Sequence, residues 1–297
     1  MSWEKFTEQQ NLASENIDQK STFEILEIIN AEDKKVSDVV KKSLSKIEKF
    51  IDVLVEQFHN GGRLFYIGSG TSGRLGVLDA AECPPTFRTD VSMVQGVIAG
   101  GYDALIHSIE GAEDNMCDGK NIILDYNITE KDTVLGITAS SSTPYVLGAL
   151  EQAKCNNALT GLIICNSPPK LQYIDHMIPI IVGPEVITGS TRMKAGTATK
   201  MVLNMITTTS MIKLNKTFGN LMVDLRASNE KLWDRGARVV SKITNLDYND
   251  ALQLLQSANG EVKTAIVMNK LNINTQDARY KISKYKGSLR AILNSKC

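Results

Sequence analysis

Two hydrophobic patterns follow one another along the chain. From Phe23 to Leu54, apolar residues recur every three or four positions, which predicts two or three helical segments behind a polar arm. Gly61-Gly62 ends this region, and short apolar runs then alternate with helical patterns. The predicted strands are 64–67, 91–98, 133–138, 160–165 and 177–182, and the predicted helices are 72–82, 103–115, 144–155 and 194–213.

This alternation predicts an α/β fold, a three-layer sandwich in which helices flank a parallel sheet. Ligands of such sheets bind beyond the carboxyl ends of the strands. Beyond about residue 240 the pattern changes to two short helices broken at Asn259-Gly260 and a third over 280–293, a small helical bundle. We therefore expect an N-terminal arm with helices over 1–55, a sheet domain over 56–220 and a C-terminal helical region over 221–297.

The charge balance narrows the classes of partner. The 297 residues contain 33 Lys and Arg against 33 Asp and Glu, so nothing draws the chain generally to nucleic acid or to an anionic membrane. Apolar runs are too short for a membrane span, and the N-terminus lacks the apolar core of a signal peptide. We expect a cytoplasmic protein without nucleic-acid or membrane partners.

Cysteine and histidine spacing argues against a metal or disulfide framework. No pair of cysteines forms a C-x-x-C, and the three histidines lie far apart, so we expect reduced thiols and no metal site. The cysteines are Cys83, Cys117, Cys155, Cys165 and Cys297.

The segment 64–86 reads as a buried strand, a loop of glycines and hydroxyl residues, and a helix. Such a loop builds an anion cradle, because the first N–H groups of a helix lack internal partners. The expected contacts are Ser69, Gly70, Thr71, Ser72 and Gly73.

The same loop also fits the dinucleotide fingerprint G-x-G-x-x-G. A Rossmann site wants an acid at the end of the second strand, whereas Asp90 precedes that strand and Gln95 lies near its far end. A nicotinamide cofactor remains the rival interpretation. A Walker loop is excluded, since no Gly-Lys-Ser/Thr follows.

Two further loops repeat the design, at 137–144 and 187–194. One such loop is most often an ordinary helix cap, but three in one sheet favour an anionic, polyhydroxylated ligand. Arg192 and Lys194 are either anion contacts or ordinary surface charges. The candidate binding residues in these loops are Ser140, Ser141, Thr143, Ser190, Thr191, Arg192 and Lys194.

Two carboxylates are candidates for acid–base chemistry. Glu82 stands at the predicted end of its helix, before Pro84 and Pro85, and a helix C-terminus disfavours an anion. That environment favours the protonated form which a general acid needs. Glu113 lies on the next predicted helix, where it is either part of a solvated face or a second acid/base.

These loops resemble sugar isomerase (SIS) domains, and the wider pattern resembles the N-acetylmuramic acid 6-phosphate etherases. The most specific segments are Glu82-Cys-Pro-Pro-Thr86 and Glu110-Gly-Ala-Glu113-Asp114. Further similarity covers Thr7-Glu8 with Asn11 and Ser14, then 61–63, 68–74, 78–81, 99–101, 183–185, 189–192, 194–197, 203–204, 219–224, 229–232 and 259–268. One loop departs from the family pattern Ser-Gly-Arg-Thr-Pro, because Ser141 and Ser142 replace its glycine and arginine.

The resemblance implies a SIS-type, flavodoxin-like sheet, a small UBA-like C-terminal bundle, and a carbon–oxygen lyase that needs no metal or redox cofactor. Its substrate would be N-acetylmuramic acid 6-phosphate, cleaved to N-acetylglucosamine 6-phosphate and D-lactate by elimination and water addition. Glu82 would protonate the leaving oxygen, and Glu113 would be the second acid/base.

Two other classes stay open. A non-catalytic phosphosugar-sensing regulator would have no reason to keep both glutamates, and an aldose–ketose isomerase would lack the Glu-Cys-Pro-Pro segment. The apolar helix over 194–213, together with the helical arm and tail, predicts a homodimer with the active site near the subunit interface.

Overall fold

The computed structural model describes residues 5–295. The chain divides into two compact units, Met1–Ala81 with Val91–Thr207 and Glu82–Asp90 with Thr208–Cys297. The expected N-terminal helices therefore fall in the same unit as the sheet.

The first unit is built on a parallel sheet in the order β2-β1-β3-β4-β5. Its strands are β1 (Leu64–Gly68), β2 (Val94–Ile98), β3 (Thr133–Thr138), β4 (Leu159–Ile164) and β5 (His176–Pro179). This is the flavodoxin-like order, whose switch point lies between β1 and β3. The three-layer α/β class is confirmed, and every predicted strand is present with its ends shifted by at most three residues.

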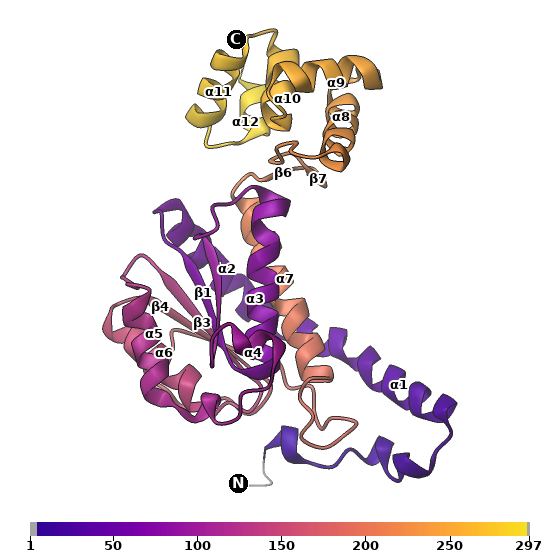
Figure 1. Ribbon diagram of the computed structural model, residues 1–297, viewed down its shortest axis with the longest axis vertical. Helices are drawn as coiled ribbons and strands as arrows, with labels where there is room; N and C mark the ends of the chain where they lie inside the picture. The colour runs from indigo at the N-terminus through magenta and orange to yellow at the C-terminus, as the bar shows by residue number, and fades with distance from the viewer. Residues whose placement is uncertain (1–4, 296–297) are drawn as a thin grey trace. The chain divides into compact units, whose positions relative to one another are not determined.

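Helices cover both faces of the sheet (Figure 1). On one face lie α5 (Met116–Asp125) and α6 (Pro144–Cys155), and on the other α2 (Leu44–His59), α3 (Gly70–Phe87) and α7 (Lys194–Lys213). Successive residues of β1 point to opposite faces. Phe65 and Ile67 join the core beneath α6, while the Tyr66 hydroxyl donates to Asp79 of α3 at 3.0 Å.

The N-terminal arm consists of three 3-10 turns, η1 (Phe6–Glu8), η2 (Leu12–Ser14) and η3 (Ile17–Gln19). Helix α1 (Thr22–Lys41) follows, begun by a reciprocal cap between Ser21 and Glu24. Two helices, α1 and α2, therefore confirm the predicted helical lead-in. The ribbon shows α1 extending away from the sheet (Figure 1). The Phe23 and Leu26 side chains of this helix are exposed.

Helix α3 is longer than the sequence predicts. It runs through Pro84 and Pro85 to Phe87, although each proline removes one backbone hydrogen bond. Cys83 and Phe87, one turn apart, are both buried, so tertiary packing holds the last turn together. The prediction that Glu82 ends the helix is wrong, because α3 continues beyond it to Phe87.

The predicted helix over 103–115 is also wrong. It is replaced by α4 (Asp103–Ile106), a loop and the single turn η4 (Ala112–Asp114). Gly111 adopts φ +77°, which interrupts the helix, and the Asn115 side chain accepts a hydrogen bond from Asp118 N–H to start α5. Glu113 consequently lies on an exposed 3-10 turn and not on a long helix.

The described part of the second unit contains the last turns of α3 and α7, a short antiparallel hairpin and five further helices. The break at Asn259-Gly260 is confirmed, but the predicted third helix is two helices separated near Gly287, which has φ +76°. The elements are β6 (Thr217–Phe218), β7 (Leu221–Met222), α8 (Glu230–Thr244), α9 (Tyr248–Ser257), α10 (Val262–Leu271), α11 (Thr275–Lys284) and α12 (Leu289–Asn294).

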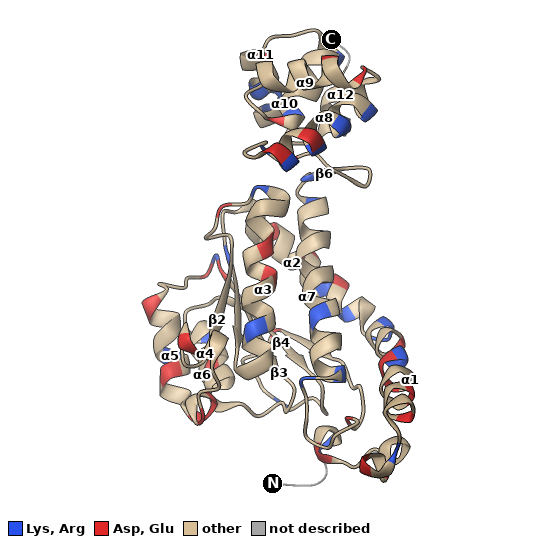
Figure 2. Cartoon of the chain, turned by 45° about the vertical axis from the view of Figure 1, so that its right-hand side comes forward, with Lys and Arg blue, Asp and Glu red and all other residues tan. Residues whose placement is uncertain are grey.

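Figure 2 shows Lys and Arg interleaved with Asp and Glu along α1. Within residues 5–295, no helix is both long and apolar enough to cross a bilayer. Cys117, Cys155 and Cys165 are free thiols and Cys83 is buried, whereas Cys297 lies outside the described residues.

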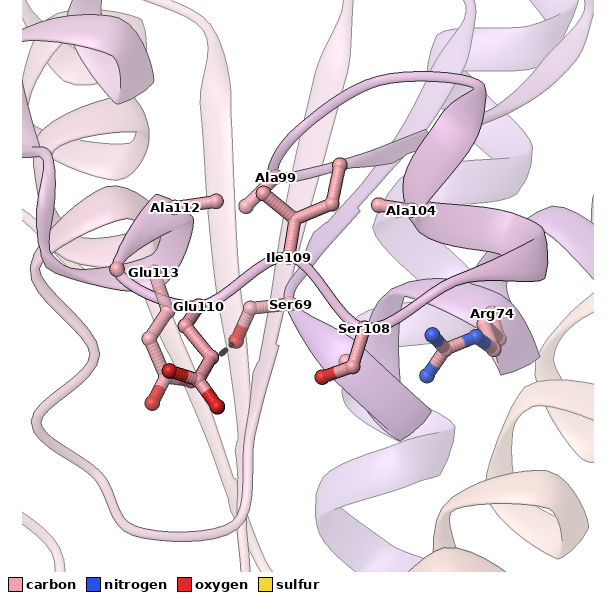
Figure 3. A pocket seen from close by; sticks show the side chains of 11 residues that line it. Ser69, Arg74, Ala99, Ala104, Ser108, Ile109, Glu110, Ala112 and Glu113 are labelled. Carbon is pink, nitrogen blue, oxygen red and sulfur yellow. Dashed lines mark hydrogen bonds between the residues drawn. The ribbon is translucent and has the colours of Figure 1, made fainter.

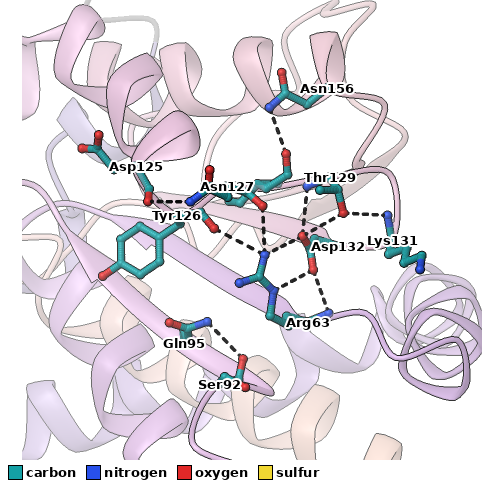
Figure 4. Close-up of polar contacts among 11 residues, drawn as sticks. Arg63, Ser92, Gln95, Asp125, Tyr126, Asn127, Thr129, Lys131, Asp132 and Asn156 are labelled. Carbon is teal, nitrogen blue, oxygen red and sulfur yellow. Dashed lines mark hydrogen bonds and ion pairs between the residues drawn. The ribbon is translucent and has the colours of Figure 1, made fainter.

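An ion pair fixes the amino ends of the two central strands (Figure 4). Arg63, which precedes β1, donates from Nε and Nη2 to the two carboxylate oxygens of Asp132 at 2.9 and 2.8 Å. Asp132 precedes β3 and also accepts the Arg63 backbone N–H at 3.1 Å. Because this clamp holds the register of β1 against β3, the loops at the opposite, carboxyl ends are held side by side.

Candidate active site

The loop after β1 makes a tight turn from strand to helix. Gly70 adopts φ +49°, and a Cβ on Gly73 would lie 2.8 Å from Gly68 O and 2.6 Å from Ile98 Cγ1. Only glycine fits at position 73 without displacement of its neighbours. The first N–H groups of α3 therefore face outward beyond the sheet, with the partly buried Thr71 and Ser72 among them.

A cavity of about 340 Å³ opens beyond the carboxyl ends of β1 and β2 (Figure 3). Ser69 Oγ donates a hydrogen bond to Glu113 Oε2 at 3.0 Å, and Glu110 points to the same place. A hydroxyl, a helix start and two carboxylates thus share one cavity. Its lining residues are Ser69, Gly70, Arg74, Ala99, Ala104, Ser108, Ile109, Glu110, Gly111, Ala112 and Glu113.

Arg74 braces the segment that carries these carboxylates. Its Nε donates to Leu105 O at 3.1 Å and its Nη2 to His107 O at 3.0 Å. Arg74 and Glu110 were not among the binding or catalytic residues predicted from the sequence. Arg74 could have been predicted from its position, because it lies four residues after Gly70, one helical turn into α3.

The loop after β3 lies next to the first loop, because Gly68 pairs with Ile137 in the sheet. Thr143 is buried, and its hydroxyl is hydrogen-bonded to Thr138 Oγ1 at 2.7 Å. Ser140 and Ser141 are partly exposed, and Ser141 has φ +63°. Ser140 and Ser141 can meet a ligand, whereas Thr143 fastens the loop from inside.

The loop before α7 contains a buried carboxylate. Glu185 accepts the backbone N–H groups of Lys194 and Ala195 at 3.0 and 2.9 Å, which caps the helix. Burial raises the pKa of Glu185, and these two hydrogen bonds oppose the rise. A Cβ on Gly196 would lie 3.5 Å from Thr71 Cγ2, so the starts of α7 and α3 are neighbours.

Lys194, which was expected to contact the substrate, forms a buried ion pair with Glu32. Its Nζ lies 2.5 Å from Glu32 Oε2, and both side chains are buried. Burial alone would raise the pKa of Glu32, but hydrogen bonds from Lys194, Lys35 and Asn11 outweigh it and lower the pKa to about 2. Arg192 stays exposed, and Ser190 and Thr191 are partly exposed near the start of α7.

Glu82 is exposed on α3, twelve residues after Gly70. At a rise of about 1.5 Å per residue, this is roughly 18 Å along the helix. Within residues 5–295, the side chains that line the Ser69–Glu113 cavity do not include Glu82.

Comparison with known proteins places the chain in a class and then in a family. Residues 46–154 match the model of the glucokinase regulatory protein N-terminal SIS domain, so this part of the chain is similar to a SIS domain. A solved protein structure from E. coli CFT073 aligns with this chain at TM-score 0.49 and 17% sequence identity. The alignment covers 67% of this chain and 95% of the E. coli chain.

Its curated relatives are more similar. The N-acetylmuramic acid 6-phosphate etherase of Clostridium beijerinckii is 50% identical over 290 residues, covering 97% of this chain and 95% of that protein. That of Clostridium acetobutylicum is 51% identical over 274 residues, covering 92% and 90%. The chain belongs to the N-acetylmuramic acid 6-phosphate etherase family.

Proposed function

We propose that this protein cleaves the D-lactyl ether of N-acetylmuramic acid 6-phosphate, giving N-acetylglucosamine 6-phosphate and D-lactate. The observation that carries the proposal is the contact of the Glu113 carboxylate with Ser69, at 3.0 Å. It holds a carboxylate beside the loop of glycines and hydroxyls that starts α3, in a cavity of about 340 Å³. The name shared by the relatives supports the same activity.

The chemistry needs a base and an acid. Ring opening exposes an aldehyde at C1, so the C2 proton becomes acidic. A base removes that proton, the C2–C3 double bond forms, and the C3–O bond to the lactyl group breaks. The leaving oxygen takes a proton and departs as lactate. Water then adds at C3 and a proton returns to C2. Each positioned proton-transfer group typically contributes about 10²–10⁴-fold.

The binding roles follow from the position of each loop. We assign the 6-phosphate to the backbone N–H groups and hydroxyls of Ser69–Gly73, assisted by Ser140, Ser141, Ser190, Thr191 and Arg192. Lys194 is left out of this set, because its ammonium is already paired with Glu32.

The catalytic roles go to the two glutamates. Glu113 is assigned to proton transfer at C2, since its carboxylate lies in the cavity. Glu82 is assigned to protonation of the lactate oxygen. A phosphosugar sensor would not need either carboxylate, and an isomerase would not need Glu82.

We further propose a homodimer whose interface lies near the active site. Exposed apolar side chains on the arm and α1 support it, since Leu12, Phe23 and Leu26 are 84%, 69% and 58% exposed. A phosphorylated substrate favours action in the cytoplasm.

The test is incubation of the purified protein with N-acetylmuramic acid 6-phosphate, followed by an enzymatic assay of D-lactate and N-acetylglucosamine 6-phosphate. Equal amounts of both products should form, and Glu113→Gln should lower the rate by about 10²-fold or more. The matched control is Glu130→Gln, an exposed glutamate in the loop before β3, which should keep the full rate. Binding of the phosphosugar without any lactate release would favour the sensor.

A further inference from the structure

The N-terminal arm crosses the same edge of the sheet as the candidate site. Phe6 N–H donates to Asn166 Oδ1 at 2.8 Å, and Asn166 Nδ2 donates to Thr7 Oγ1 at 3.0 Å. Asn166 follows the carboxyl end of β4. Gly189 N–H, from the loop before α7, donates to Thr7 O at 3.1 Å. The arm is therefore attached to two of the loops that bound the carboxyl edge.

These attachments are buried. Thr7 is 1% exposed and Asn166 is 2% exposed, and each makes more than one of the hydrogen bonds just described. Water therefore does not compete freely for these contacts. Residues 5–8 form a fixed element of the first unit, and their side chains are held in place at the edge of the sheet.

Lys5 is the charged residue that this element brings to a substrate loop. Its Nζ donates to Ser142 Oγ at 2.6 Å, in the loop after β3. Within residues 5–295, no carboxylate forms an ion pair with Lys5. Glu8, on the same arm, accepts from Thr7 Oγ1 at 3.2 Å.

A hydroxyl occupies one donor of an ammonium group but does not neutralise its charge, and two N–H donors remain. An uncompensated cation beside a loop of hydroxyls is complementary to an anionic oxygen. Ser142 also stands where the family pattern has an arginine. The arm thus brings the positive charge of Lys5 to position 142, where this chain has a serine in place of the arginine of the family pattern.

We propose that Lys5 is a substrate-binding residue, whose ammonium, positioned by Ser142, binds an anionic group of the phosphosugar. The identity of that sugar rests on the proposed function. The group is either the 6-phosphate or the lactyl carboxylate. Two ligands distinguish these possibilities. N-Acetylglucosamine 6-phosphate has the phosphate alone, whereas N-acetylmuramic acid 6-phosphate has both.

The experiment compares Lys5→Met with the wild type in the full-length protein. It measures the Kd of N-acetylglucosamine 6-phosphate by calorimetry and the KM of N-acetylmuramic acid 6-phosphate by lactate release. We expect a loss of about tenfold or more, the size of one charge-assisted hydrogen bond. A loss with both ligands assigns Lys5 to the phosphate, and a loss with the lactyl ether alone assigns it to the carboxylate. Lys20→Met, on the same arm after η3, is the matched control and should change neither value.

A rescue variant separates charge from folding. Lys5→Met combined with Ser142→Arg supplies a cation from the loop itself, so it should recover most of the lost affinity. Unchanged affinity for both ligands in Lys5→Met would overturn the proposal. Lys5→Arg keeps the positive charge and should bind both ligands nearly as well as the wild type. Affinity that stays low in Lys5→Arg, and also in Lys5→Met with Ser142→Arg, would overturn the proposal as well. Absence of lactate release in the wild type would refute the etherase alone, because calorimetry with both sugar phosphates would still test Lys5.

Discussion

Ser141 holds a backbone conformation that suits glycine. Its φ of +63° lies in the left-handed region, where a side chain typically costs about 1–2 kcal/mol. The family pattern has glycine at this position, and the serine keeps the same turn with the help of a hydrogen bond from its Oγ to Ser140 O at 2.6 Å.

Ser141→Gly should therefore raise the free energy of unfolding by about 0.5 kcal/mol, since relief of strain exceeds the extra entropy of glycine in the unfolded chain. Urea unfolding followed by circular dichroism measures the change. Ser142→Gly, at a neighbouring position outside the left-handed set, should bring no gain. A lower stability in Ser141→Gly would contradict this account of the loop.

The Glu32–Lys194 pair predicts a particular dependence on pH. The pKa of Glu32 in the folded protein is about 2, below its ordinary 4.5. Ionised Glu32 therefore stabilises the fold above pH 4.5, and this contribution is lost as the pH falls from 4.5 towards about 2. Glu32→Gln should cost about 3 kcal/mol or more at pH 7, because it leaves a buried ammonium without its counter-charge.

The measurement is the free energy of unfolding of both proteins between pH 7 and pH 3. The difference between wild type and Glu32→Gln should shrink below pH 4.5. Glu27→Gln, exposed on the same helix, should show no such trend. A difference that stays constant over this range would rule out the ionised pair as its source.

At the scale of single residues, the sequence predicted the contacts among residues that are close together in the chain. The hydroxyls of Ser69 and Ser72 were foreseeable, because strand, loop and helix are contiguous. The role of Lys194 was not, since its partner Glu32 lies 162 positions away in the chain. The contact of Glu113 with Ser69 likewise joins residues 44 positions apart, and the residues alone left Glu113 open between a solvated face and an acid/base.

At the scale of elements, periodicity predicted the sheet and most helices. It failed where tertiary packing overrides a local rule. Helix α3 continues through Pro84 and Pro85 because Cys83 and Phe87 are buried. The segment 103–115 has no long helix because Gly111 breaks it. Both errors bear on catalysis, since they move Glu82 into a helix interior and Glu113 into a turn at the cavity.

The start of α3 predicts selectivity for the phosphate. The helix dipole favours a dianion there, and charge-assisted hydrogen bonds contribute about 1.5–3 kcal/mol each. The phosphorylated sugar should therefore exceed N-acetylmuramic acid by at least about 100-fold in kcat/KM. Ser72→Ala should lower kcat/KM for the phosphorylated sugar and hardly change it for the plain one, while the exposed Ser37→Ala should change neither. Equal turnover of both sugars by the wild type would show that this loop does not bind phosphate.

At the scale of the whole molecule, the Glu82 that acts in a given active site can come from the same subunit as Glu113 or from its partner. It is exposed and lies twelve residues beyond the loop on one continuous helix. We propose that in the dimer Glu82 of one copy acts with Glu113 of the other. Glu82→Gln and Glu113→Gln would then each be inactive, yet a heterodimer of the two would contain one intact site.

Co-expression of the two variants under different tags tests this arrangement. Random association should restore about a quarter of wild-type activity in the mixture, and about half in the purified heterodimer. Each variant alone is the control. An inactive heterodimer would place both glutamates of a site in the same chain, and a monomer in light scattering with full activity would refute the dimer itself.

The central claim is cleavage of the ether by elimination and water addition, and isotopes test it most directly. Turnover of N-acetylmuramic acid 6-phosphate in H₂¹⁸O should place the label at C3 of N-acetylglucosamine 6-phosphate and leave D-lactate unlabelled, because the C3–O bond breaks. Turnover in D₂O should place deuterium at C2. Mass spectrometry of both products reads out each result. ¹⁸O in the lactate, with no deuterium at C2 of the sugar, would contradict the account.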